Sequence, residues 1–173
     1  AAFANYNFYQ GRLITRGLPH QTERLVALPE TTDSHLQFLA SRRLLFLSYA
    51  SGEGNSANNE NVNYCEAELI ARLVEDFIAY YTQRGIKFNV KEELGIIVPY
   101  RMQIAAVRAA IRLRGIEDSD AIAIDTVERY QGSERKVIIY GFTAQTPFQL
   151  NFLASSSTWE TGSLIDRKLN VAM

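Results

Sequence analysis

Four short runs of apolar, β-branched or aromatic residues divide the chain, and each run has the length of a buried β-strand. They cover residues 43–49, 94–98, 121–126 and 136–142. Runs that stay apolar at nearly every position, without alternating polar residues, are typical of strands covered on both faces of a parallel sheet. The pattern therefore predicts buried parallel strands.

Between these runs, apolar residues recur at helical spacing. Residues 64–84 carry such a stripe, and residues 102–113 carry a second one. Asn63 can cap the first helix, Glu66 can reach back to it as the partner of a capping box, and Gly85 can end the helix. Strand and helix thus alternate, which predicts βαβ crossovers and a doubly wound α/β fold with a mainly parallel sheet flanked by helices.

Two segments have the composition of loops. Residues 51–61 are rich in Gly, Ser and Asn, and residues 147–163 are long and contain three consecutive serines. Short helices are expected near residues 3–9 and from Asp166 onward.

Composition narrows the class of protein. The chain has 173 residues, of which 47% are hydrophobic and 21% charged, as expected for a single domain spanning 1–173. The net charge is −1, so contact with nucleic acid requires a local basic patch. The single cysteine, Cys65, rules out an internal disulfide, and the spacing of the two histidines predicts no metal site. With no apolar run of about 20 residues and no signal peptide, we expect a cytoplasmic protein without a membrane partner.

Two nucleotide-binding fingerprints fail on this sequence. Residues 52–57, GEGNSA, fit the loose dinucleotide pattern, but the next helix starts only near Asn63, too late for its N-terminus to hold a pyrophosphate. A flexible linker is the better interpretation. No Gly-x-x-x-x-Gly-Lys-Ser/Thr P-loop occurs, so the chain is not expected to hydrolyse ATP alone.

The polar turn between the last two strands has the chemistry of a ligand site. Strand ends are where open α/β sheets bind ligands. Thr126 offers a hydroxyl to a phosphate oxygen, Gly132 permits close backbone approach, and Gln131 and Glu134 offer hydrogen bonds of opposite kinds. From the residues alone, an ordinary solvated connection is the more economical interpretation of this turn.

The motifs around this turn resemble those of superfamily 1 helicases of the Upf/Dna type. Residues 126–134, TVERYQGSE, look like motif V, and residues 166–173, DRKLNVAM, look like the opening of motif VI. Residues 95–103, GIIVPYRMQ, and 63–67, NYCEA, match two further segments of that family's second RecA-like domain, and residues 3–13 resemble the segment after motif IV. These blocks occur in the family's order along the whole chain.

The resemblance implies a role for each matching residue. Gln131, Gly132 and Glu134 would face the nucleotide, with the Glu134 carboxylate near the ribose. Thr126, Pro99, Tyr100 and Arg101 would contact the nucleic-acid backbone, and Asn170 would help to position the motif VI helix. Residues 143–146, TAQT, depart from the commoner polar-Arg-Ser/Thr-Asn sequence, which puts the contacts of that segment in doubt.

The resemblance also implies a reaction and its partners. ATP and Mg²⁺ would bind between this RecA-like domain and a first one in a longer polypeptide, which would supply the P-loop and the Mg²⁺ ligands, while this chain holds no catalytic residue of its own. The whole would translocate on or unwind DNA or RNA. Two alternatives stay open: a non-catalytic nucleic-acid-binding module, and an unrelated doubly wound enzyme acting on a small metabolite.

Arginines along the second helix offer a further clue to a nucleic-acid surface. Arg101, Arg108 and Arg112 project within a narrow arc, and guanidinium rows suit phosphates. A solvated helix face is the more economical interpretation of the same stripe.

Overall fold

The computed structural model describes residues 5, 10–12, 14, 16–17, 25–26, 33–48, 61–130, 135–154, 158–160 and 163–165. Contacts divide the chain into two compact units, Ala1–Ser51 and Gly52–Met173. Each unit is described by itself. The single domain expected from the sequence stays a prediction.

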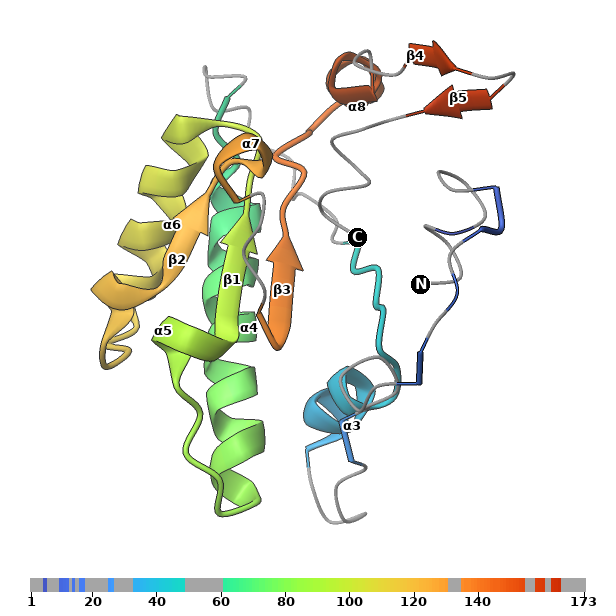
Figure 1. Cartoon of the computed structure of the whole chain (residues 1–173). Helices are drawn as coiled ribbons and strands as arrows, with labels where there is room; N and C mark the ends of the chain where they lie inside the picture. The colour runs from blue at the N-terminus through green and yellow to red at the C-terminus, as the bar shows by residue number, and fades with distance from the viewer. Residues whose placement is uncertain are drawn as a thin grey trace. The chain divides into compact units, whose positions relative to one another are not determined.

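A three-stranded parallel sheet forms the centre of the larger unit (Figure 1). Its strands are β1 (Leu94–Ile97), β2 (Ala123–Asp125) and β3 (Val137–Tyr140), in the order β2-β1-β3. These are three of the four predicted strands, each slightly shorter than its apolar run. Flanked by helices, the parallel sheet confirms the predicted α/β, RecA-like fold class.

Helices α4 (Tyr64–Gln83) and α6 (Arg101–Leu113) pack against each other on one face of this sheet (Figure 1). Strand residues alternate between faces, so the fully buried Leu94, Ile96 and Val98 all point to this helical side. The side chain of Asn63 accepts a hydrogen bond from the amide of Glu66 at the start of α4, as predicted. Gly85, at φ +67°, ends the helix in the left-handed conformation.

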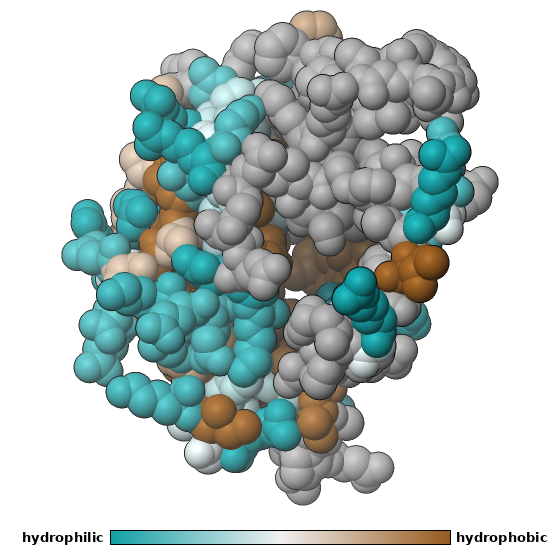
Figure 2. Space-filling view, viewed as in Figure 1, coloured by the Kyte–Doolittle hydropathy of each residue, from teal (hydrophilic) through white to brown (hydrophobic). Residues whose placement is uncertain are grey.

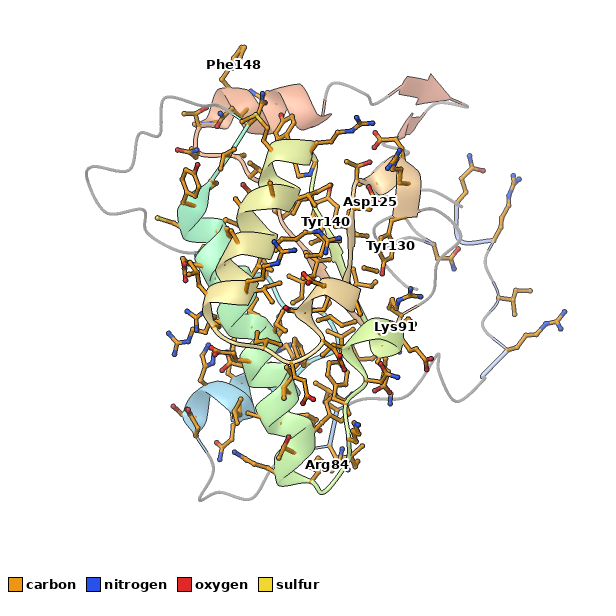
Figure 3. The ribbon with its side chains drawn as sticks, turned by 90° about the vertical axis from the view of Figure 1, so that its left-hand side faces the viewer. Arg84, Lys91, Asp125, Tyr130, Tyr140 and Phe148 are labelled. Carbon is orange, nitrogen blue, oxygen red and sulfur yellow. The ribbon has the colours of Figure 1, made fainter. Side chains whose placement is uncertain are left out.

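A smaller cluster covers the opposite face. The short helix α7 (Val127–Tyr130) follows β2 and packs Val127 and Tyr130 against Ile97. Figure 3 shows Tyr130 lying alongside the strands. A Cβ on Gly95 would lie 1.7 Å from the Tyr130 hydroxyl oxygen, so the ring occupies the space that a side chain on Gly95 would fill. This glycine is therefore needed for the packing of α7.

Short elements complete the connections in the larger unit. α5 (Val90–Glu93) precedes β1, and the 3₁₀ turn η1 (Ser119–Ala121) precedes β2. The side chain of Asn89 caps α5 by accepting from the amides of Lys91 and Glu92. Hydrophilic residues dominate the surface over α5 and α6 (Figure 2).

The smaller unit contains α3 (Ser34–Ala40), capped by the Asp33 side chain, which accepts from the amide of His35. The strand predicted at 43–49 is wrong for its described part, because residues 43–48 are irregular. Leu44 and Phe46 are 64% and 77% exposed in this segment. An apolar run has the composition of a strand, but only a hydrogen-bonded neighbour makes it one.

The loop predicted at 147–163 is also wrong. It contains α8 (Pro147–Ala154) and an antiparallel pair of strands, β4 (Thr158–Glu160) and β5 (Ser163–Ile165). Thr146 and Gln149 form a capping box at the start of α8. The amide of Gln149 donates to the Thr146 hydroxyl at 3.3 Å, and the amide of Thr146 donates to the Gln149 side chain at 3.1 Å.

Three other sequence-based expectations fall outside the described residues: most of the helix near 3–9, the linker at 51–60 and the helix from Asp166. Within the described part of the chain, no helix is both long enough and apolar enough to span a membrane.

Candidate functional site

The carboxyl ends of the three parallel strands meet at one edge of the sheet, which we call the strand-end edge. Ile97 is in register with Asp125 on β2 and with Tyr140 on β3. Two hydrogen bonds extend the ladder beyond the strands: Val98 N–H to the Asp125 carbonyl at 3.1 Å, and Gly141 N–H to the Ile97 carbonyl at 2.9 Å. The segments leaving β1, β2 and β3 therefore start side by side.

Pro99, Tyr100 and Arg101 leave β1 at this edge. Pro99 and Tyr100 are half-buried, and Arg101 is exposed as the first residue of α6. The Tyr100 carbonyl accepts from the amide of Ile104 at 3.2 Å, which ties the turn to the helix. Arg101 thus offers a guanidinium to solvent from a fixed backbone.

Thr126 leaves β2 at the same edge and is half-buried. Its amide donates to the Asp125 side chain at 2.9 Å, and its carbonyl accepts from the amides of Arg129 and Tyr130 at 3.1 and 3.0 Å. These bonds begin α7. The structure therefore places Thr126 at the same edge as Pro99, Tyr100 and Arg101.

The other predicted site residues lie outside the described part of the chain. Gln131, Gly132 and Glu134 belong to the segment between Tyr130 and Arg135, and Asn170 belongs to residues 166–173. Tyr130 is 6% exposed, and burial raises the pKa of its hydroxyl, although the charge of Arg135 opposes this shift. The segment 131–134 lies in the sequence between the helix α7, which ends at Tyr130, and the strand β3, which begins at Val137.

Sequence reasoning missed a buried polar cluster behind this edge, formed by Asn63, Glu66, Gln103 and Thr143, which we call the polar node. The Glu66 carboxylate accepts from the amide of Phe142 at 2.8 Å and from the amide of Thr143 at 2.8 and 3.0 Å. It also accepts from the Gln103 side-chain amide at 3.2 Å. Burial raises the pKa of Glu66, while the bonds from Thr143 and Phe142 oppose the shift.

This arrangement corrects the predicted capping box on α4. The amide of Asn63 donates to the Gln103 side chain at 2.8 Å, in the place predicted for Glu66. Gln103 returns a hydrogen bond from its Nε2 to the Asn63 carbonyl at 2.9 Å. Glu66 turns instead toward Phe142 and Thr143 and accepts hydrogen bonds from their amides.

A signal for the polar node was present in the sequence. Gln103 shares a helical stripe with Val107, Ala110 and Ile111, all of which are buried. A polar residue on such a stripe must find hydrogen bonds inside the protein. The position of Gln103 therefore predicts buried polar partners, although it does not identify them.

The arginines predicted to form a stripe on α6 differ in their surroundings. Arg112 forms an ion pair with Asp120, with 2.7 Å between Nη2 and Oδ1. Arg114 binds Glu75 and Glu68, and its hydrogen bond to Glu75 raises its pKa. Arg101 lies at the strand-end edge, one helix length away from Arg112. The solvated-face interpretation therefore holds for Arg112, and Arg101 is the member of the stripe suited to a ligand at the edge.

Electrostatically, the described part of the edge offers hydroxyl groups, the exposed guanidinium of Arg101 and the carboxylate of Asp125, with the exposed Arg129 on the adjoining α7. Within the ranges that the structure describes, no three His, Cys, Asp or Glu side chains come close enough together to hold a metal ion. Arg101 can pair with a phosphate, and Thr126 and Tyr100 carry hydroxyls that can donate to one. The arrangement suits a phosphate-bearing ligand that lies across the strand ends.

Comparisons with known proteins point to one family. A family model described as an AAA domain matches residues 1–173. The putative helicase MOV-10 of Gallus gallus is 30% identical over 117 residues, which cover 64% of this chain. The DNA replication ATP-dependent helicase/nuclease DNA2 of Xenopus laevis is 26% identical and covers 99% of this chain, and the helicase sen1 of Schizosaccharomyces pombe is 28% identical and covers 70%.

The chain spans only a small part of each relative. The matched region is 12% of the MOV-10 protein, 16% of the DNA2 protein and 6% of sen1. The comparisons therefore concern one part of each relative, and not the activity of the whole protein.

Proposed function

The chain belongs to the AAA domain family and is a superfamily 1 helicase motor domain of the C-terminal, RecA-like kind, and from this premise we propose that it works as half of an ATP-driven motor on DNA or RNA. ATP and Mg²⁺ bind between it and a first RecA-like domain of the same polypeptide. Closure and opening of that cleft move the polypeptide along the nucleic acid or unwind a duplex. The family match argues against the alternative of an unrelated metabolite enzyme.

One observation carries the proposal. The strand-end edge aligns the turns after β1, β2 and β3, and the residues that match the family's nucleic-acid motifs lie there: Pro99, Tyr100, Arg101 and Thr126. We assign these four residues to the nucleic-acid backbone. Phosphate and sugar contacts of this kind fix the position of a strand without reading its sequence, as a translocating motor requires.

The segment between α7 and β3 is the part of the site that we propose binds the nucleotide. We assign Gln131, Gly132 and Glu134 to the nucleotide, with the Glu134 carboxylate accepting from the ribose hydroxyls. Support comes from the sequence match to motif V and from the position of the segment between α7 and β3. Bound Mg²⁺ would neutralise the charge on the phosphates of ATP during transfer of the γ-phosphoryl group. The ligands of Mg²⁺ would come from the first RecA-like domain. Asn170 is proposed to orient the helix of motif VI.

The test measures binding to single-stranded nucleic acid. Arg101→Ala is expected to weaken the binding of a fluorescent oligonucleotide about tenfold at low salt, the order of magnitude for one charge-assisted contact. The slope of log K against log salt should fall by about 0.7, the value for one phosphate on a single strand.

Arg84→Ala is the matched control for this test. Arg84 follows the last residue of α4 and lies at the end of the fold opposite to Asp125 (Figure 3). Its replacement removes one positive charge away from the strand-end edge, so affinity and salt slope should stay unchanged. Equal losses in both variants would mean that overall charge, and not the strand-end edge, holds the nucleic acid.

A further inference from the structure

The polar node joins three segments that are distant in the sequence. Asn63 and Glu66 belong to the start of α4, Gln103 to the first turn of α6, and Thr143 to the turn after β3. Gln103 and Thr143 are fully buried, and Glu66 is 8% exposed. The residue pairs joined by these hydrogen bonds are 37 to 77 positions apart along the chain. The node therefore fixes tertiary structure and not a single turn.

The Glu66 carboxylate performs a local task, because it accepts from the consecutive amides of Phe142 and Thr143. An apolar side chain at position 66 would take this acceptor away from the amides of Phe142 and Thr143. Consecutive amides in a turn form a concave anion site, and Glu66 supplies the anion from within the chain.

Thr143 shows what this anion holds in place. Its φ is +60°, in the left-handed region that a β-branched residue rarely adopts. Such strain persists only where the surroundings enforce it. Both Glu66 oxygens accept from the Thr143 amide, so the carboxylate is one of the groups that can hold this conformation.

The node also reaches the turn after β1. Gln103 follows Arg101 by two residues in the first turn of α6, and its side chain is bonded both to the backbone of Asn63 and to Glu66. Gly141 donates to the carbonyl of Ile97, which joins the start of the β3 exit to the end of β1. One carboxylate thus ties together the exits of β1 and β3.

We propose that Glu66 is a positioning residue that sets the relative placement of the turns at 99–101 and 142–145, and thereby the path of nucleic acid across the strand-end edge. The role rests on the proposed function, since it assumes that nucleic acid binds there. Glu66 itself is buried and does not touch the ligand. It acts by holding Thr143 and Gln103.

Glu66→Gln tests this role with a nearly isosteric change. The variant removes one negative charge, so simple electrostatics predicts equal or tighter binding of a polyanion. Positioning predicts the reverse: affinity for a single-stranded oligonucleotide about tenfold weaker, the factor that one charge-assisted hydrogen bond is worth. Glu68→Gln, at an exposed position of the same helix, is the matched control and should bind at least as well as the unmodified chain.

A second substitution separates positioning from a general loss of structure. Glycine adopts φ near +60° without strain, so Thr143→Gly removes the need for enforcement. In the Glu66→Gln background it should restore most of the lost affinity. If Glu66→Gln binds as tightly as the unmodified chain, or if Thr143→Gly restores nothing, the positioning role is wrong.

Amide hydrogen exchange follows the turn without any ligand. Exchange at Phe142 and Thr143 should be about tenfold faster in Glu66→Gln than in the unmodified chain, and unchanged in Glu68→Gln. Unchanged exchange in Glu66→Gln would overturn the proposal. If the unmodified chain binds no nucleic acid at all, the proposed function fails, whereas the exchange rates still decide whether Glu66 holds the turn.

Discussion

Replacing Gly95 by alanine should disrupt the cluster that carries α7. The new Cβ would lie 1.7 Å from Oη and 2.5 Å from Cζ of Tyr130, and 3.1 Å from Cγ of Arg135. The two contacts with Tyr130 are shorter than real Cβ contacts, so either the ring or the strand must move. Gly95 lies in a strand paired on both sides, and Tyr130 is 6% exposed, so neither group moves freely.

The size of the effect lies between two limits. Overpacking a core typically costs about 1–3 kcal/mol, and losing an aromatic ring from its site costs about 3–5 kcal/mol. Replacing glycine in a strand by alanine returns about 0.5–1 kcal/mol through the unfolded chain. We therefore expect Gly95→Ala to lower the free energy of unfolding by about 2–4 kcal/mol, which urea denaturation followed by circular dichroism can measure.

A double-mutant cycle tests the cause of this loss. Tyr130→Ala removes the clashing ring, so the two substitutions together should cost less than the sum of their separate effects, by about 1–3 kcal/mol. Gly85→Ala serves as the control: nothing lies within 4 Å of its Cβ, and its φ of +67° predicts a loss of about 1 kcal/mol from backbone strain alone. A loss below about 0.5 kcal/mol in Gly95→Ala, or strict additivity with Tyr130→Ala, would refute the packing argument.

Two smaller predictions concern charged pairs. Burial alone would raise the pKa of Glu93, but hydrogen bonds from Lys136 and from the Asn89 amide outweigh it and hold that pKa below its usual value. The Glu93–Lys136 pair should therefore contribute fully to the free energy of unfolding well above about pH 4.3, the pKa of a glutamate in the unfolded chain. This contribution should be lost as the pH falls through the lower pKa of Glu93 in the folded chain. Lys136→Met should weaken this pH dependence, because only the Asn89 amide then still lowers the pKa of Glu93, at a cost below about 1 kcal/mol in pH-dependent urea titrations. An unchanged profile would contradict this prediction. Arg112→Ala should leave oligonucleotide affinity unchanged in the assay used for Arg101, because Asp120 already neutralises Arg112. A tenfold loss of affinity would contradict this prediction and would mean that the arginine stripe beyond Arg101 also binds nucleic acid.

Local patterns in the sequence predicted the centre of the fold. Continuous apolar runs marked β1, β2 and β3, and Asn63 and Gly85 marked the ends of α4, because strand burial and helix capping depend on neighbouring residues. The predicted strand at 43–49 failed in its described part because apolar composition does not create a pairing partner. At α8, a usable signal was overlooked: Thr146, Pro147 and Gln149 form a capping box with proline at the first helical position.

The candidate site was predictable only in part. Thr126 and the turn at 99–101 lie at the same edge because the parallel strands β1 and β2 end there, and their roles as site residues stay predictions. The partners of Glu66 were not predicted, because Phe142 and Thr143 are 76 and 77 residues away and no local spacing connects them. A local capping box and a distant buried turn compete for the same carboxylate, and only tertiary packing decides between them.

The most direct test of the account is Mg²⁺-dependent ATP hydrolysis, measured for this chain alone and for a polypeptide that carries it together with a P-loop-bearing first RecA-like domain. We predict negligible turnover by the chain alone. The two-domain polypeptide should hydrolyse ATP, with stimulation by single-stranded nucleic acid and with at least about a tenfold loss in Glu134→Gln. Turnover by the chain alone that survives Glu134→Gln, or two-domain hydrolysis indifferent to both nucleic acid and Glu134, would contradict the shared-cleft motor.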